Sequence, residues 1–145
     1  MKKIMLITAM LFTLSITNAE DKVVTFAQIP QSAQEFTNAN FKGKKIASAQ
    51  METSLFGAIT DGYKVVFTDG TEIEFDSDGN WEEISAKTSS VPSDLIPEKI
   101  TKYIKDNFGG SPVVVLKKES KGFEVELATK QELKFNNNYI FIGLD

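Results

Sequence analysis

The second half of this 145-residue chain repeats its first half. With a shift of 60 residues, the segment from Tyr63 to Ile84 aligns without a gap with the segment from Phe123 to Leu144. A shift of 67 residues aligns Ile29-Pro30 with Ile96-Pro97. The two shifts differ by seven, so the first copy carries seven extra residues between Met51 and Gly62. The pattern predicts one structural unit used twice, with one longer loop.

Each copy predicts a helix followed by strands. In the second copy Ile96, Ile100, Ile104 and Phe108 recur every four residues, which forms one apolar stripe on a helix. The first copy has a weaker stripe after Pro30. Alternating apolar and polar residues then predict antiparallel strands covered on one side. The strands are expected at residues 46–51, 63–68, 71–75, 81–85, 113–117 and 123–128, and the repeat implies two further strands that complete the four of the second copy.

We therefore predict an α+β fold of two tandem units, each a helix plus a four-stranded antiparallel sheet, with the helices on one face of the sheet. The expected boundaries are residues 20–85 for the first unit, 86–92 for a linker and 93–145 for the second unit. Because a single unit would leave bare sheet edges, we expect the two sheets to join or abut.

The N-terminus has the layout of a secretory signal peptide. Two lysines precede an apolar run that ends near Thr17, and Ala19 provides a small residue for cleavage. We expect residues 1–19 to be removed and the mature chain to begin at Glu20. The apolar run is short for a membrane span, and no cysteine follows it to carry a lipid anchor. The expected location is periplasmic or secreted, without membrane insertion after cleavage.

Composition argues against several classes of function. The mature chain has 14 lysines against 20 acidic residues, a net charge of −6, which disfavours nucleic acid. The chain has no histidine, cysteine or arginine, so the imidazole used by most serine, cysteine and zinc hydrolases is missing. We predict that the protein is not an enzyme and holds neither a cofactor nor a metal.

Two sequence motifs resemble a known family. An Ile-Pro pair opens both expected helices, and the run DGTEIEFDSDGNW extends from Asp69 to Trp81. In these features the chain resembles the PepSY-like, beta-lactamase-inhibitor-like family of exported bacterial proteins, over essentially the whole mature chain. The resemblance implies two tandem helix-plus-sheet units and an inhibitor-like recognition of another protein. The second copy lacks the Asp-Gly motif and has Thr129-Lys130 in its place.

The seven extra residues supply the main binding candidates. They create a loop over residues 53–62 that carries Leu55, Phe56 and Ile59. Apolar side chains in a loop either fold back on the domain or bind a partner. Our first hypothesis is a non-catalytic exported binding module that recognises an unknown protein in the cell envelope through this loop and the uncovered sheet face. Trp81 is added as an interface anchor if it points outward; it faces the core together with Ile84 only if a bulge intervenes.

Two alternatives involve acidic residues. Asp76, Asp78 and Asn80 around Gly79 partly match a calcium loop, so the turn from Asp76 to Asn80 is a candidate calcium or small-ligand site. The same residues also suit a hairpin turn that caps its own backbone. A carboxylate hydrolase using Glu72, Glu74 and Asp76, with Glu82 and Glu83 nearby, ranks last because their alternation with apolar residues favours a solvated sheet face.

Overall fold

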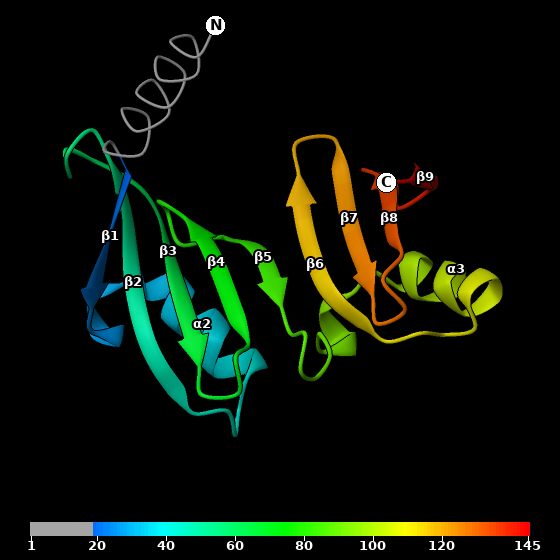
Figure 1. Ribbon diagram of the computed structural model, residues 1–145, viewed down its shortest axis with the longest axis horizontal. Coiled ribbons are helices and arrows are strands. Elements are labelled where there is room, and N and C mark those ends of the chain that lie inside the picture. The colour runs from blue at the N-terminus through cyan, green and yellow to red at the C-terminus, as the bar shows by residue number, and fades with distance from the viewer. Residues whose placement is uncertain (1–18) are drawn as a thin grey trace, which may run out of the picture.

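The computed structural model describes residues 19–145 as one continuous antiparallel sheet of nine strands. Each strand pairs with the strands before and after it in the chain, so the sheet runs in order from β1 to β9 (Figure 1). The strands are β1 (Ala19–Val24), β2 (Ile46–Ser54), β3 (Ile59–Phe67), β4 (Glu72–Asp76), β5 (Trp81–Ser85), β6 (Val113–Glu119), β7 (Gly122–Leu127), β8 (Glu132–Asn136) and β9 (Phe141–Leu144).

Within residues 19–145, two α-helices accompany the sheet, α2 (Gln31–Asn40) and α3 (Glu98–Phe108). Each begins directly after a proline, Pro30 or Pro97, whose fixed φ suits a helix start. Helix α3 ends at Gly109, which has a φ of 65° in the left-handed region where glycine is favoured. Two short 3-10 helices precede them, η1 (Phe26–Gln28) and η2 (Ser93–Leu95).

The prediction of two tandem units, each with its own four-stranded sheet, is wrong. Strand β5 pairs with β6, with Glu83 opposite Lys117, Ile84 opposite Leu116 and Ser85 opposite Val115, which makes one sheet of both halves. A further strand, β1, adds to the edge of β2 and was not predicted. The buried side chains of both halves also form one hydrophobic core.

A row of apolar side chains crosses the whole sheet in register. The six central members of the row are completely buried, and both helices pack on the face that they form, with Ile100 of α3 and Ala33 of α2 also fully buried. Burying a side chain of this size stabilises the fold by roughly 1.5–3 kcal/mol. In strand order the row consists of Val24, Ala49, Val65, Ile73, Ile84, Leu116, Val125, Leu133 and Leu144.

The opposite face of the sheet is polar. The neighbouring row on this face carries charges of both signs, in the order Lys64, Glu74, Glu83, Lys117, Glu124 and Lys134. Lys64 Nζ lies 3.4 Å from a carboxylate oxygen of Glu52 and 3.6 Å from one of Glu74. Opposite charges on neighbouring strands stabilise the pairing modestly, by roughly 0.2–1 kcal/mol each.

The segment expected to be a linker, residues 86–92, is attached to the sheet. The backbone N–H of Ala86 donates to the carbonyl of Val114 at 2.7 Å, and that of Val91 donates to the carbonyl of Val113 at 2.8 Å. Both Ala86 and Val91 are buried in the core. The connection between the halves is therefore part of the packed structure.

The predicted signal peptide falls almost wholly on residues 1–18, which lie outside the described part of the chain. Strand β1 begins at Ala19, next to the expected cleavage point. Among residues 19–145, neither helix has the length and apolar character needed to cross a membrane.

Candidate functional site

The seven extra residues lengthen the β2–β3 hairpin, including both strands and the turn between them. Strands β2 and β3 continue to Ser54 and from Ile59, so only four residues lie between them, where a loop over 53–62 was predicted. Strand β4 first pairs with β3 at Gly62, and the hairpin therefore extends beyond the end of β4 (Figure 1). We call residues 55–59 the hairpin tip.

The hairpin tip exposes its large apolar side chains. Leu55 is 53% exposed, Phe56 75% and Ile59 46%, although side chains of these types are usually buried. Leu55 and Phe56 have φ values of 50° and 57°, in the left-handed region that is costly for residues other than glycine. The backbone N–H of Gly57 donates to the carbonyl of Ser54 at 3.2 Å, which closes the turn. The tip is thus a defined turn that presents apolar side chains to solvent.

Strand β1 supports this hairpin on one side. It pairs along the outer edge of β2 from Ala49 to Ser54, up to the last residue before the tip. Across the hairpin, Ser54 Oγ donates to a carboxylate oxygen of Asp61 at 3.2 Å. The base of the tip is therefore held by three strands.

Trp81 lies two strands away from this hairpin, at the start of β5, and faces the helix. Its ring stacks on Phe36 of α2, with 6.0 Å between centroids, and Lys118 Nζ lies 3.9 Å from the ring centroid. A register shift between Glu74 and Phe75 lets Trp81 and Ile84 both face the core, which is the bulge that the sequence required for this arrangement. Trp81 is half-buried, and it does not join the hairpin tip in one surface.

The candidate calcium turn caps its own backbone. Asp76 Oδ1 accepts the N–H groups of Asp78 and Asn80, both at 2.9 Å. Burial alone would raise the pKa of Asp76, but the hydrogen bonds from Asn80, Asp78 and Gly79 outweigh it and bring the pKa below its ordinary value. In the matching turn between β8 and β9, the uncharged Asn136 accepts the same pair of bonds from Asn138 and Ile140.

Because an asparagine oxygen accepts the same two hydrogen bonds, capping of this turn does not require a negative charge. Over residues 19–145, no three His, Cys, Asp or Glu side chains gather in a way that suits a metal ion.

Three of the five acidic residues considered for hydrolysis, Glu72, Glu74 and Glu83, lie on the polar sheet face around Lys64. Glu72, Glu74 and Glu83 line a small hollow of about 130 Å³ with Lys64 and Ser85. Burial raises the pKa of Glu83, and the neighbouring Glu74 raises it further. Burial lowers the pKa of Lys64, but the surrounding glutamates more than compensate, so its pKa is raised. The cluster is a network of ion pairs, and its hollow is far smaller than a usual substrate pocket of roughly 300–1,000 Å³.

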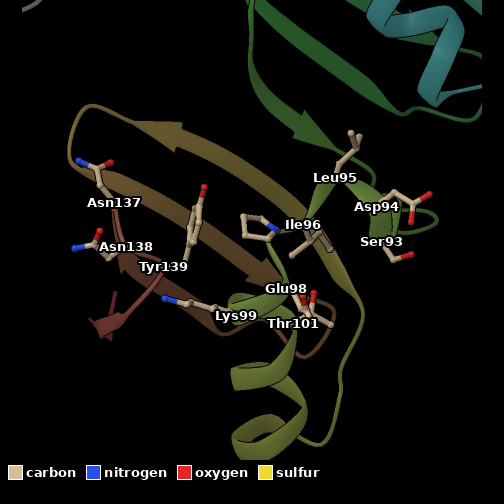
Figure 2. A pocket seen from close by; sticks show the side chains of 11 residues that line it. Ser93, Asp94, Leu95, Ile96, Glu98, Lys99, Thr101, Asn137, Asn138 and Tyr139 are labelled. Atoms are coloured by element: carbon tan, nitrogen blue, oxygen red, sulfur yellow. The ribbon is translucent and has the colours of Figure 1, made fainter.

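A groove that the sequence analysis missed lies between α3 and the β8–β9 turn. It measures about 770 Å³ and is lined by residues 93–99, Thr101 and residues 137–139. Figure 2 shows Asn138 and Tyr139 on one side of it and Ile96 and Lys99 on the other. In the first half the equivalent turn is packed against α2: a Cβ atom on Gly79 would come within 2.7 Å of the Cβ of Pro30. The repeat aligns Gly79 with Tyr139, and this difference in residue type is the sequence feature that could have indicated the groove.

Comparisons with known proteins agree on a family and a location. A family model described as "Putative beta-lactamase-inhibitor-like, PepSY-like" matches residues 61–143. A crystal structure of a "putative calcium-regulated periplasmic protein" from Bacteroides thetaiotaomicron is 38% identical, with a TM-score of 0.80, covering 86% of this chain and 96% of that one. A crystal structure of a "putative periplasmic protein of unknown function" from Bacteroides vulgatus is 36% identical, with a TM-score of 0.79, covering 87% of this chain and 99% of that one.

The search of curated proteins gave no match. The periplasmic descriptions of the similar structures confirm the predicted location outside the cytoplasm. The family model covers more than half of the chain and confirms the resemblance noted in its motifs. This protein belongs to the PepSY-like, beta-lactamase-inhibitor-like family.

Proposed function

We propose that this protein is an exported, non-catalytic binding module that recognises another protein of the cell envelope through the hairpin tip. The observation that carries the proposal is the exposure of Leu55, Phe56 and Ile59 on a structured turn. Exposed apolar clusters of this kind mark protein interaction sites. Apolar and aromatic anchors of an interface supply most of its binding energy.

The turn geometry supports the same proposal. Positive φ values at Leu55 and Phe56 are unfavourable for these residues and persist only where the surrounding structure holds them. The pairing of β1 and β3 with β2 provides that support. A tip fixed before binding loses less conformational entropy on association than a flexible loop.

The polar sheet face would border such an interface. Its lysines and glutamates favour a partner with complementary charges, which steers association more than it adds affinity. Trp81 is left out of the proposed surface because Phe36 and Lys118 cover its ring. Because the family model is described as beta-lactamase-inhibitor-like, one kind of partner to test is an enzyme that the module would inhibit.

The test replaces Leu55, Phe56 and Ile59 together by serine. Because the three side chains are exposed, the denaturation midpoint should hardly change. Capture of a partner from a periplasmic extract should be lost. The matched control is Val23→Ser, which removes an 80% exposed apolar side chain on β1 and should leave capture intact. A drop in stability of several kcal/mol in the triple variant would instead show that the tip packs on its own domain.

A calcium-binding function is the second candidate, and it is favoured by the description of the Bacteroides thetaiotaomicron relative as calcium-regulated. The residues proposed for it are Asp76, Asp78 and Asn80. Calorimetric titration with calcium would test it, with Asp76→Asn as the variant, because Asn136 shows that asparagine can keep the turn. Heat of binding in the original chain that disappears in the variant would support calcium; no heat in either would exclude this site.

A further inference from the structure

Strand β9 forms an apolar edge of the sheet. Among the described residues it pairs only with β8, so its other edge is open. Ile140, Ile142 and Leu144 are 55%, 63% and 60% exposed. The residues 60 positions earlier in the repeat are Asn80, Glu82 and Ile84. The second half thus places isoleucine at two exposed positions where the first half has polar side chains.

The first half shows what covers a strand at this position. Strand β5, the equivalent of β9, is covered by β6, and Ile84 beside Leu116 is completely buried. Leu144 occupies the same place in the repeat, but within residues 19–145 no strand lies beyond β9, and most of the Leu144 side chain is exposed. An antiparallel strand added to β9 would give Leu144 the neighbour that Ile84 has.

The two free edges of the sheet differ in their side chains. Strand β1 exposes Val23 but also Asp21 and Lys22, and charged side chains on an edge oppose pairing with another sheet. The segment from Phe141 to Leu144 has no charged residue. The sheet therefore has one edge protected by charges and one edge open to pairing.

We propose that β9 pairs antiparallel with β9 of a second copy of this chain, about a two-fold axis at Gly143. A two-fold axis normal to the sheet reverses the strand direction and makes the pairing self-complementary. It places Ile142 of the second copy beside Leu144. Pairing of β9 with β1 of a second copy is disfavoured for two reasons. If the sheet continued into the second copy with the same face up, β9 and β1 would be parallel instead of antiparallel, and β1 carries charges.

The contact is small, because β9 has only four residues. Stable protein interfaces bury at least about 1,000 Å², so this pairing should be weak and reversible. Asp145, next to the strand, adds no unpaired charge because its carboxylate lies 3.4 Å from Lys134 Nζ. We therefore expect a weak monomer–dimer equilibrium, with a Kd of roughly 10 µM to 1 mM.

The experiment measures the mass of the chain from Glu20 onward by sedimentation equilibrium over that concentration range. The average mass should rise from one chain toward two, and backbone amide signals that shift with concentration should lie in residues 141–145. Ile142→Lys and Leu144→Glu should each keep the chain monomeric. The control Val23→Lys adds the same charge on the other edge, at β1, and should leave the association unchanged.

Circular dichroism checks that each variant is folded, and Ile142→Lys alone decides the outcome if Leu144→Glu unfolds. A mass of one chain at every concentration would overturn the proposal. Association that survives Ile142→Lys, or that is lost in Val23→Lys, would overturn it too. Loss of association in the triple serine variant of the hairpin tip would assign the contact to that tip instead of β9.

Discussion

The two halves of the sheet hold the same aromatic cluster but surround it differently. In the first half Phe36 of α2 meets Phe75 edge-on at 6.0 Å and stacks on Trp81. In the second half Tyr103 of α3 meets Phe135 edge-on at 5.6 Å and stacks on Phe141 at 4.7 Å. Positions that face the helix have kept their packing, whereas positions that face a neighbouring strand or turn have diverged.

The divergence is concentrated where the first half has a neighbour that the second half lacks. Ile84 is covered by β6 and Leu144 is not. Gly79 packs closely on the start of α2, while Tyr139 leaves a groove beside α3. The comparison teaches that the helix and its aromatic cluster stabilise each half, and that the turns and edges are free to acquire other roles.

The largest losses of folding stability should be equal in the two halves. Phe75→Ala and Phe135→Ala each remove a nearly completely buried ring, so each should lower the free energy of unfolding by about 3–5 kcal/mol. Equilibrium denaturation measures both. A cost that is nearly zero in one half would break the equivalence of the two aromatic clusters.

The next pair of substitutions should lower the free energy of unfolding by unequal amounts. Ile84→Ala should cost about 2–5 kcal/mol because its side chain is fully buried between strands. Leu144→Ala should cost less than about 1 kcal/mol, since most of its side chain is already exposed. Both are measured by denaturation at low protein concentration, where the chain is monomeric. Equal costs would contradict the statement that β6 makes the difference.

Substitutions at two equivalent turn positions test the cost of a left-handed backbone conformation. Gly70 has a φ of 89° and Lys130, its counterpart, a φ of 77°. Gly70→Lys should destabilise by about 1 kcal/mol, because left-handed backbone costs a residue with a side chain roughly 1–2 kcal/mol. Lys130→Gly should stabilise by a smaller amount, since glycine also gains freedom in the unfolded chain. Thermal unfolding of both variants reports the signs, and like signs would refute the argument.

The smallest effect concerns charge on the polar face, where Glu83 of the first half corresponds to Gly143. Burial and the nearby Glu74 raise the pKa of Glu83 above its ordinary value of 4.5, so folding favours the neutral carboxyl. This contribution to stability is complete below the unfolded pKa and is lost as pH rises through the folded pKa. Glu83→Gln should therefore stabilise the fold by a few tenths of a kcal/mol at pH 7 and not below about pH 4. A variant less stable at pH 7 would contradict this sign.

The sequence predicted the helix-facing positions because their spacing is set by local geometry. The period of four at Ile100 and Ile104, and the alternation that buries Ile73 and Phe75, both appear in the structure. The conditional prediction for Trp81 also held, since the required bulge is present.

The sequence did not reveal which strands would meet. Strand β1 carries three successive charged residues and lacks the alternation of apolar and polar residues that predicts the other strands, so nothing in its sequence indicated that it pairs with β2. Strands β5 and β6 pair through three residue pairs. Among these pairs, only the opposite charges of Glu83 and Lys117 could have indicated from sequence that the two strands are neighbours. The proposed partner residues remain a prediction; their exposure at the hairpin tip was not deducible, because an apolar loop can equally fold back.

The strand order carries a consequence for how the protein forms. Each strand pairs with the next strand in the chain, and six of the eight pairings among the described strands close across a short turn, whereas β1–β2 and β5–β6 enclose a helix. Closing short loops costs little entropy, and folds built from local contacts form faster than those that need distant ones. An exported chain that emerges from its N-terminus can therefore add the strands of residues 19–145 to the growing sheet in the order β1 to β9.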